Sequence, residues 1–423
     1  MLTVVIGGGA AGMTAAAAAA RAGSQVTLLE KNEKLGKKIY ITGKGRCNVT
    51  NSCDFDTFIA NIVRNPRFMY SSLHSFGPED TMHMIEENGV KLKVERGNRV
   101  FPVSDHASDI TKALCRALEK AGVRIRLHAE VNSIEKKGER FLLKVSGSGK
   151  KEELLCDRVI VCTGGRSYPT TGSTGDGYRF AEELGLAVRP QSPSLVSIVA
   201  SDGLCADLAG VSLVNTGLSV FRMTDGRPVG KALYTGVGEL LFTHKGISGP
   251  LVLTASAILS GMISPETPYL FSVDLKPGLT DEMLDKRILR DLSERANMDM
   301  GNALAGLLIG GIREAVLKKA GIDPAEKARS VTRPERQELV RVIKHFDLTA
   351  VSAGGFEEAV VTKGGVDVKE LDPRTMEVKK IRGLYFAGEV VDVDAFTGGF
   401  NLQCAFSMGH AAGKSVWEEK INE

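Results

Sequence analysis

The chain has 423 residues, of which 43% are hydrophobic and 25% charged, and this ordinary globular composition excludes a disordered or fibrous protein. Its formal net charge of +3 does not demand a polyanionic partner. The seven cysteines include no C-x-x-C pair, so neither a disulfide framework nor a zinc ribbon is expected. No apolar run reaches the roughly 18 residues of a membrane span, and no signal peptide is recognisable, so we expect a soluble, cytoplasmic protein without membrane contact.

The first thirty residues predict a complete βαβ unit. An apolar run over 2–6 is typical of a buried parallel strand, and the glycine-rich segment 7–12 predicts a turn. An alanine-rich helix over 13–22 and a second strand over 25–30 follow.

Helices and strands alternate less regularly after this unit. The pattern predicts helices over 78–88 and 108–121, the second with one apolar face. Strands are predicted over 123–131, 140–146 and 154–162, and a Gly/Ser/Lys turn joins the last two as a hairpin.

The pattern of apolar and turn residues changes at about residue 190. Short alternating runs such as 211–221 and 269–275, separated by turn residues, predict a small barrel or sandwich. Between 280 and 345 the apolar spacing becomes helical. After residue 364 strands return, followed by a Gly-rich loop and a closing helix over about 406–419. This order predicts a parent domain that is split by an insertion.

The first glycine-rich turn carries the spacing G-x-G-x-x-G at Gly7, Gly9 and Gly12. The first glycine permits the tight turn, the second lets a pyrophosphate approach the backbone, and the third lets helix and strand pack closely. Glu30, at the end of the second strand, is placed to accept hydrogen bonds from ribose hydroxyls. A carboxylate there disfavours a 2′-phosphate, so the residues predict bound FAD or NAD rather than NADP.

Five further motifs resemble a known family. They are GKGRCNVTN (43–51), RVFPVSDHAS (99–108), TGGRSYPTTGSTGDGY (163–178), LLFTHKGISGP (240–250) and GLYFAGEVVDVDAFTGGFNLQCAFSMG (383–409). In this order the chain resembles, from residue 2 to about 413, the bacterial YhiN/BaiN-like flavoproteins, which include aminoacetone-oxidase-like members and belong to the two-dinucleotide-binding-domain flavoproteins. The resemblance implies non-covalent FAD.

The resemblance also implies a fold and a division into domains. The expected class is α/β, with a Rossmann-like FAD-binding domain interrupted by a β-barrel domain that carries a small helical insert. We expect the FAD-binding domain over 1–190 and 357–423, the barrel over 191–278 and 346–356, and the helical insert over 279–345.

The resemblance further implies which residues contact the cofactor. Residues expected at the pyrophosphate, the ribose and the flanks of the cofactor are Gly7, Gly9, Ala10, Ala11, Gly12, Glu30, Lys31, Gly36, Lys37 and Lys38. Those expected near the phosphates and the isoalloxazine, at adenine and beneath the cofactor are Arg46, Cys47, Asn48, Val131, Thr163, Gly164 and Gly165. Those expected at the ribityl chain and at flavin N1/O2 are Gly388, Glu389, Gly399, Asn401, Leu402 and Gln403.

The last of these groups has a physical purpose. Negative charge grows at N1/O2 when a flavin is reduced, so the N-terminus of a helix there would stabilise the reduced form. One position departs from the family: Lys44 stands where many relatives carry glycine.

Other residues carry weaker signals. Cys47 could donate a proton, but a buried packing thiol is the more frequent role. His244 could face the active site from the barrel, although a histidine at a strand-end turn is commoner, and no His/Cys cluster suggests a metal. Asp392 and Asp394 more often orient a loop than form a catalytic pair. No catalytic residue is assigned.

The sequence leaves the redox partner and the substrate open. No second βαβ unit is present, so NAD(P)H, if used, would be a transient reductant. The leading hypothesis is NAD(P)H-dependent reduction of an activated C=C bond, in a conjugated 3-oxo steroid or bile acid or in a uracil of ribosomal RNA. Segment 311–345 holds nine basic and five acidic residues, which indicates a solvated helix face or, less often, an RNA-contacting surface. The alternatives are an oxidase of a small amine such as aminoacetone, using O2, and an FAD-bearing RNA-binding or assembly factor.

Overall fold

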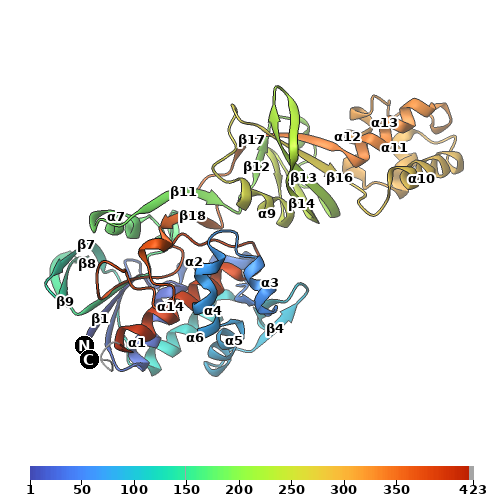
Figure 1. The fold of residues 1–423 in the computed structure, drawn as a ribbon. Coiled ribbons are helices and arrows are strands. Elements are labelled where there is room, and N and C mark those ends of the chain that lie inside the picture. The colour runs from blue at the N-terminus through green and yellow to red at the C-terminus, as the bar shows by residue number, and fades with distance from the viewer. Residues whose placement is uncertain (148, 419–423) are drawn as a thin grey trace. The chain divides into compact units, whose positions relative to one another are not determined.

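The computed structural model describes residues 1–147 and 149–418. It forms two compact units, and the chain passes from the first to the second and back (Figure 1). The first unit comprises Met1–Ser194 and the chain from Gly355 onward, and the second comprises Leu195–Gly354. The insertion therefore lies between the two halves of the first unit.

A parallel five-stranded sheet organises the first unit. Its strand order is β19-β10-β1-β2-β6, and all four neighbouring pairs are parallel. The strands are β1 (Leu2–Ile6), β2 (Gln25–Leu29), β6 (Arg124–Arg126), β10 (Arg158–Val161) and β19 (Leu384–Phe386). Such a sheet needs helices on its faces, which explains why its strands, apart from the edge strand β6, carry mainly apolar residues. The predicted Rossmann-like architecture is confirmed.

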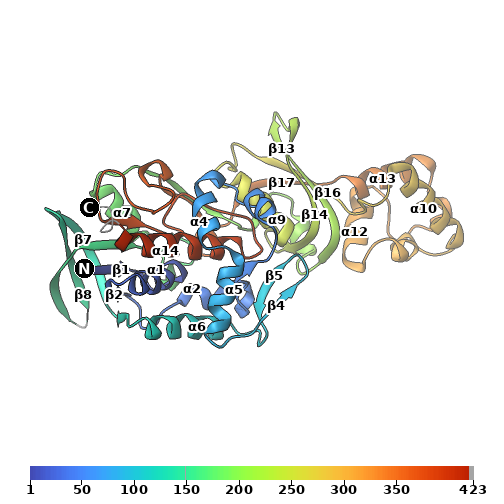
Figure 2. The same cartoon turned by 60° about the horizontal axis from the view of Figure 1, so that its bottom comes forward.

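Helix α1 (Ala10–Arg21) packs closely on the last described helix, α14 (Phe400–Glu418), as Figures 1 and 2 show. A Cβ atom at Gly409 would lie 2.3 Å from the Ala11 carbonyl oxygen, and one at Gly413 would lie 2.2 Å from that of Ala15. Only small residues allow two helix backbones to approach so closely. The alanine run therefore serves packing.

The predicted bounds of both helices were wrong at their first residue. Helix α1 begins at Ala10 rather than Met13, so the glycine-rich turn is shorter than predicted. Helix α14 begins at Phe400, six residues earlier than predicted, because Gly398 and Gly399 (φ +123° and +98°) end the preceding loop. Residue 419, the predicted end, lies outside the described residues.

Small antiparallel sheets complete the first unit. They are β3-β5-β4 (Thr50–Asn51, Arg99–Pro102, Leu92–Glu95), β7-β8-β9 (Glu130–Lys137, Arg140–Gly147, Lys150–Cys156) and β11-β18 (Val188–Ser194, Val361–Val366). The predicted hairpin is confirmed as β8 and β9. The single strand predicted over 154–162 was wrong, because the chain leaves one sheet at Cys156 and enters the parallel sheet at Arg158. The strand predicted over 123–131 is likewise divided between β6 and β7.

The remaining helices of the first unit surround these sheets. They are α2 (Lys37–Ile41), α3 (Phe55–Ala60), α4 (Tyr70–Ser75), α5 (Pro78–Glu87), α6 (Ala107–Lys120) and α7 (Asp176–Glu183). The two helices predicted from the apolar spacing correspond to α5 and α6. One continuous hydrophobic core joins the parallel sheet to its covering helices.

The second unit contains a closed six-stranded barrel, so the predicted barrel is confirmed. Its order is β12-β15-β14-β13-β16-β17, with bounds Ile198–Ala200, Gly246–Ser248, Arg227–Thr243, Ser212–Thr224, Tyr269–Asp274 and Phe346–Ala353. Helices α8 (Leu204–Asp207) and α9 (Pro250–Leu259) belong to the same unit. Closure removes exposed strand edges, and alternating side chains fill the interior.

The predicted helical region of this unit is also confirmed. It contains α10 (Asp281–Glu294), α11 (Met300–Ala303), α12 (Gly310–Lys319) and α13 (Arg333–Lys344). Helices α10 and α13 begin at side-chain caps, because Thr280 and Thr332 each accept a hydrogen bond from a first-turn N–H group. Their buried apolar faces join the barrel side chains in one second core.

Candidate functional site

The glycine-rich turn after β1 has three glycines with three different surroundings. A Cβ atom on Gly7, which has φ +102°, would lie 2.4 Å from the Cys162 carbonyl oxygen. A Cβ atom on Gly12 would lie 1.8 Å from the Gly7 carbonyl oxygen. A Cβ atom on Gly9 would meet no described atom within 4 Å. Gly7 and Gly12 are therefore required by packing, whereas Gly9 borders open space.

Helix α1 points its N-terminus at this open space. Its N-cap residue is Gly9, which has no side chain to cap the helix, and Ala10 and Ala11 form the first turn. The first N–H groups of a helix have no partner within the helix and carry partial positive charge. The turn is therefore shaped to accept an anionic group such as a pyrophosphate.

Glu30 lies directly beside this turn. One carboxylate oxygen accepts from the Gly8 N–H at 2.7 Å, and the other accepts from the N–H and the side-chain amide of Asn32 at 2.8 and 2.7 Å. A carboxylate has about four acceptor positions, so three bonds leave one for a ribose hydroxyl. Glu30 both clamps the turn and fits the role predicted for it.

Most of the predicted motifs meet at one edge of the parallel sheet. Gly7 follows β1, Glu30 follows β2, Thr163 follows β10, and Gly388 follows β19. Because these strands are parallel and adjacent, their carboxyl ends share one edge, which is where open α/β sheets bind ligands. Four segments that are far apart in the chain thus come together.

All three predicted lysines have acidic partners, and two of them form simple pairs. The Lys31 ammonium contacts Asp176 at 2.6 Å and also donates to Thr174. Lys37 contacts Glu33, four residues earlier in the chain, at 3.2 Å. Between them, Gly36 adopts φ +69° and its N–H donates to the Gly8 carbonyl at 2.8 Å. A backbone hydrogen bond therefore holds segment 31–38 against the glycine-rich turn.

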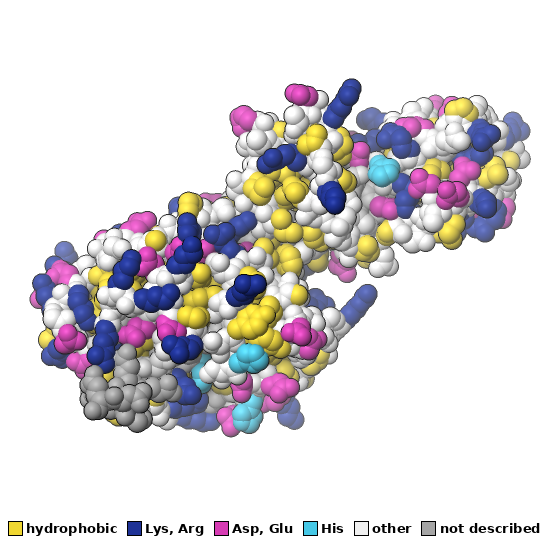
Figure 3. Space-filling view, viewed as in Figure 1, with side chains coloured by type: hydrophobic (Ala, Val, Ile, Leu, Met, Phe, Trp, Pro, Cys, Tyr) yellow, Lys and Arg dark blue, Asp and Glu magenta, His cyan; other side chains and the backbone are white. Residues whose placement is uncertain are grey.

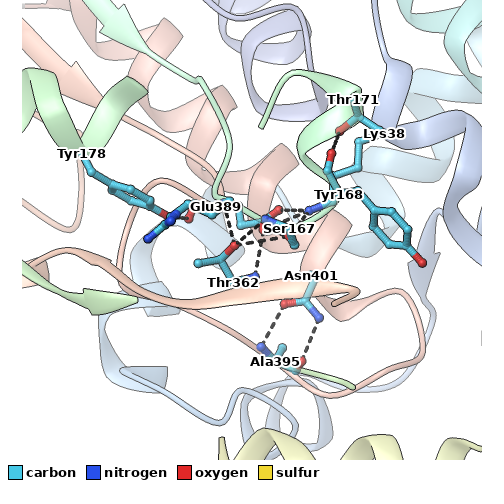
Figure 4. Close-up of polar contacts among 10 residues, drawn as sticks. Lys38, Ser167, Tyr168, Thr171, Tyr178, Thr362, Glu389, Ala395 and Asn401 are labelled. Carbon is cyan, nitrogen blue, oxygen red and sulfur yellow. Dashed lines mark hydrogen bonds and ion pairs between the residues drawn. The ribbon is translucent and has the colours of Figure 1, made fainter. Parts of the chain in front are cut away.

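The third lysine belongs to a polar cluster that sequence reasoning missed (Figure 4). Lys38 lies 2.9 and 2.7 Å from the two carboxylate oxygens of Glu389 and 2.6 Å from the Ser167 hydroxyl. Glu389 also accepts from the Ser167 hydroxyl at 2.6 Å and from the Thr362 N–H at 2.9 Å. We call Lys38, Ser167, Thr362 and Glu389 the Glu389 cluster. It joins four separate segments of the first unit.

The charge of Glu389 is stabilised by this cluster. Burial opposes ionisation, but the nearby Lys38 ammonium and the hydrogen bonds from Ser167 and Thr362 hold the pKa of Glu389 below its usual value. Three bonds reach one of its oxygens and a single bond reaches the other. The second oxygen thus retains acceptor capacity for a cofactor hydroxyl.

The GKGRCN loop is held in place by left-handed residues and an ion-pair network. Lys44 has φ +58°, a left-handed conformation that favours glycine. Arg46 pairs with Asp105 at 2.7 Å and with Glu95, and it stacks over the ring of Phe101. Its guanidinium is therefore engaged by carboxylates, and the phosphate contact expected from the sequence stays a prediction.

Of the next two residues of this loop, Cys47 is buried and Asn48 is half-buried. Cys47 has φ +59° and is fully buried, and burial raises the pKa of its thiol to about 12. The side-chain carbonyl oxygen of Asn48 is buried and has no hydrogen-bond partner among the described residues. A thiol of that pKa is a poor acid or nucleophile at neutral pH. The amide of Asn48 is available for a ligand.

Four other predicted positions lie in a strand or shortly after one. Val131 is in β7, opposite Val145, and its side chain is buried. Gly164 has φ +73°, and a Cβ atom on Gly165 would lie 2.3 Å from the Thr362 hydroxyl oxygen. The hydroxyl oxygen of Thr163 is buried without a partner among the described residues. The 163–165 turn therefore keeps one polar group free.

The N-terminus of α14 is fixed by two asparagines. Asn401 donates to the Ala395 carbonyl at 2.8 Å and accepts from its N–H at 2.9 Å, as Figure 4 shows. Asn51 donates to the Gly398 carbonyl at 3.0 Å. A Cβ atom on Gly399 would lie 2.4 Å from the Thr50 carbonyl. These contacts set the direction of the helix, so its first N–H groups and their dipole have one orientation.

Three further residues at this end serve packing. The Gln403 side chain is buried and bonds Thr50, Ser407 and the Phe76 carbonyl, so it faces the protein interior. Leu402 packs on the hydrophobic core. A Cβ atom on Gly388 would lie 2.7 Å from the Ala11 Cβ atom. Any cofactor contact of Leu402 and Gln403 would thus come from the backbone.

The weaker candidates are also placed. His244 lies in the turn between β14 and β15 and is exposed. Among the described residues no group of three or more His, Cys, Asp or Glu side chains could hold a metal ion. No helix in the described part of the chain is long and apolar enough to span a membrane.

Four of the nine basic residues of segment 311–345 form ion pairs within the second unit. Arg336 pairs with Asp285, Lys327 with Asp299, and Arg341 with Glu338. Lys344 pairs with Asp274, and Arg313 donates to the Gly301 carbonyl. In Figure 3 acidic and basic side chains alternate over α10–α13. This pattern is typical of a solvated helix face.

Comparisons with known proteins give the same picture over almost the whole chain. The family described as the HI0933-like protein Rossmann domain matches residues 1–415. The chain is similar to the ribosomal RNA dihydrouridine synthase of Haemophilus influenzae, with 32% identity over 420 residues, 98% of each chain. It is also similar to the 3-dehydro-bile acid delta(4,6)-reductase of Clostridium scindens, with 31% identity over 396 residues, 93% of each.

A solved structure shares the fold. The 3-ketosteroid delta1-dehydrogenase from Sterolibacterium denitrificans superposes with a TM-score of 0.52 at 16% identity, and the match covers 99% of both chains. At this identity the likeness describes the fold alone.

Proposed function

The chain belongs to the HI0933-like Rossmann-domain family, and on that premise we propose that it is an FAD-dependent oxidoreductase that reduces a C=C bond conjugated with a carbonyl group. The resemblance to YhiN/BaiN-like flavoproteins drawn from the motifs is thereby confirmed. We further propose NAD(P)H as the transient reductant. FAD, when bound, supplies the hydride chemistry, and the protein supplies binding, orientation and electrostatics.

One observation carries the cofactor proposal. The open space at Gly9 lies at the N-terminus of α1, beside Glu30, at the edge where four parallel strands end. A dinucleotide needs an anion site for its pyrophosphate and an acceptor for its ribose hydroxyls, and this edge provides both. Asn48 and Thr163 add buried polar atoms whose partners are missing among the described residues. The residues present fit FAD.

The orientation of α14 supports a role in reduction. Asn51 and Asn401 hold the helix N-terminus in one direction. We propose that this end faces flavin N1/O2, where its dipole stabilises negative charge. The Glu389 cluster would hold the ribityl chain in a fixed position, because Lys38 and Thr362 fix the carboxylate that accepts a hydrogen bond from a ribityl hydroxyl.

The names of the relatives suggest the type of bond that is reduced. Formation of dihydrouridine saturates the C5=C6 bond of uracil, which is conjugated with a carbonyl group. A delta(4,6)-reductase acts on double bonds that can be conjugated with a 3-oxo group. We propose a uracil in ribosomal RNA as the first substrate to test, because the dihydrouridine synthase aligns over 98% of both chains. A conjugated 3-oxo steroid is the second.

The experiment is an anaerobic stopped-flow titration of the purified holoprotein, following bleaching of the oxidised flavin. NADH, NADPH and aminoacetone are added separately, and the reduced protein is then mixed with ribosomal RNA that lacks dihydrouridine or with a conjugated 3-oxo steroid. We expect rapid bleaching by a pyridine nucleotide and reoxidation by one of the two acceptors.

Each other outcome has a defined meaning. Bleaching by aminoacetone alone would contradict the proposal and favour an amine oxidase. A flavin that none of the three donors reduces would indicate a structural cofactor in an RNA-binding or assembly factor. Purification without any bound FAD, and no binding of added FAD, would contradict the cofactor proposal itself.

A further inference from the structure

Asp394 is a buried carboxyl group with an unusual deficit of hydrogen bonds. Its residue is 1% exposed. One carboxyl oxygen accepts from the Ser194 hydroxyl at 3.3 Å, and the other has no hydrogen-bond partner among the described residues. Two other buried aspartates of this unit differ. Asp392 bonds Arg64 and Asn65, and Asp367 bonds Arg189 and the Lys369 N–H.

The groups around Asp394 come from every element packed on it. Ser194 ends β11, Lys363 belongs to β18, Arg64 precedes the 65–69 turn, Asp392 is two residues away, and Cys404 is in α14. Lys363 and Arg64 attract a negative charge on Asp394, whereas Asp392 repels it. Cys404 is a neutral thiol, since burial raises its pKa to about 12. Two cations and one anion thus share this region.

The ionisation of Asp394 is finely balanced. Burial raises the pKa of its carboxyl to about 6, and the charge of Lys363 and the Ser194 hydrogen bond only partly oppose that rise. At neutral pH the group is therefore ionised, but a modest new negative charge nearby would protonate it. An interaction of one pKa unit corresponds to about 1.4 kcal/mol.

The backbone connects Asp394 to the N-terminus of α14. Its carbonyl accepts from the N–H groups of Val63 and Arg64 at 2.9 and 3.2 Å. The next residue, Ala395, is held on both its N–H and its carbonyl by Asn401, in the first turn of α14. Asp394 is thus fixed one residue from the clamp that orients the helix end proposed to face flavin N1/O2.

We propose that Asp394 takes up a proton from solvent when the flavin is reduced and releases it on reoxidation. The inference rests on the proposed function, because it places the growing negative charge at the end of α14. A hydride equivalent brings two electrons and one proton to the flavin and leaves it anionic. One further solvent proton converts the Asp394 carboxylate into the acid. Two protons are then taken up for two electrons, so the protein offsets the charge that reduction adds.

The test is the pH dependence of the flavin midpoint potential, measured on the holoprotein with a chemical reductant and reference dyes. For a two-electron couple a tenfold change in equilibrium constant corresponds to 29.6 mV. One extra proton taken up on reduction therefore makes the slope of the midpoint potential against pH steeper by about 30 mV per pH unit. We expect this steeper slope in the wild type above pH 6 and its loss in Asp394→Asn. Asp367→Asn is the control, because Asp367 is also buried but each of its carboxylate oxygens has a partner, and it should keep the wild-type slope.

A second measurement does not depend on a variant that folds. The infrared difference spectrum of the wild type, reduced minus oxidised, should contain the C=O stretch of a newly protonated carboxyl group. Absence of that band, or a wild-type slope in Asp394→Asn, would overturn the inference. Because both measurements use a chemical reductant and no substrate, they can fail while NAD(P)H oxidation and C=C reduction succeed. Conversely, a protein that binds no FAD would refute the proposed function first.

Discussion

The contrast between Gly9 and Gly12 separates what the first turn needs for folding from what it needs for binding. Gly9 has φ −83° and ψ −169°, which alanine adopts readily, and its Cβ atom would meet no described atom within 4 Å. Gly9→Ala should therefore leave the apoprotein as stable as the wild type, or stabilise it by about 0.4–1 kcal/mol through the unfolded chain. If the pyrophosphate occupies this space, a methyl group there weakens FAD binding by at least about 100-fold, or ~2.7 kcal/mol.

Gly12→Ala should show the opposite pattern of stability. Its Cβ atom would lie 1.8 Å from the Gly7 carbonyl oxygen, so helix α1 and strand β1 must separate. Overpacking of this kind costs about 1–3 kcal/mol. The free energy of unfolding of both apoproteins is measured with urea, and FAD affinity by quenching of flavin fluorescence. Wild-type FAD affinity in Gly9→Ala would refute the assignment of the open space to the cofactor, and equal destabilisation of both variants would refute the packing argument.

Three further predictions follow from single side chains. Lys38→Met leaves the Glu389 carboxylate, whose side chain is 19% exposed, without its cation, so the free energy of unfolding in urea should fall by about 3–5 kcal/mol. Lys38→Met/Glu389→Gln should recover much of that free energy, and no recovery would argue against the ion pair. The pKa of Asp394 is raised from 3.8 to about 6, so between these pH values the folded state binds more protons than the unfolded state, and stability falls as pH rises from about 4 to 6. The contribution of Asp394 to this fall is about 3 kcal/mol. It should be absent from Asp394→Asn when both proteins are unfolded at pH 4 and at pH 6. Burial raises the pKa of Cys47 to about 12, so the rates of flavin reduction and turnover in Cys47→Ser should stay within a few-fold of the wild-type rates. A loss of about 100-fold in the stopped-flow rates would show that the thiol takes part in the reaction.

Local patterns in the sequence determine the elements that bind the dinucleotide. The apolar run before Gly7, the spacing of Gly9 and Gly12, and the acid at Glu30 each have a meaning within a βαβ unit. These features could be predicted because residues within about thirty positions of one another dictate them. Alternation in the later strands left a barrel and a sandwich open, and the barrel is closed by β12 and β17, which are far apart in the chain.

The tertiary structure alone decides the partners of the charged residues. Lys38 and Glu389 are 351 positions apart, and no local spacing relates them. Arg46 matches a phosphate contact by motif, but β4 and the turn after β5 place Glu95 and Asp105 beside it. A side chain takes the nearest partner that folding provides, and that choice involves segments whose proximity depends on the whole sheet.

The same distinction applies to Asp394. Its sequence neighbours suggest only an orienting role near a glycine-rich loop. Its burial, its unpaired oxygen and its raised pKa arise because β11, β18 and α14 close around it and exclude water. The sequence by itself determined that a dinucleotide fold with its glycine signatures would form. Only the tertiary structure decided which carboxyl groups are paired and which one is left able to titrate, because desolvation and ion pairing depend on what surrounds a side chain in space.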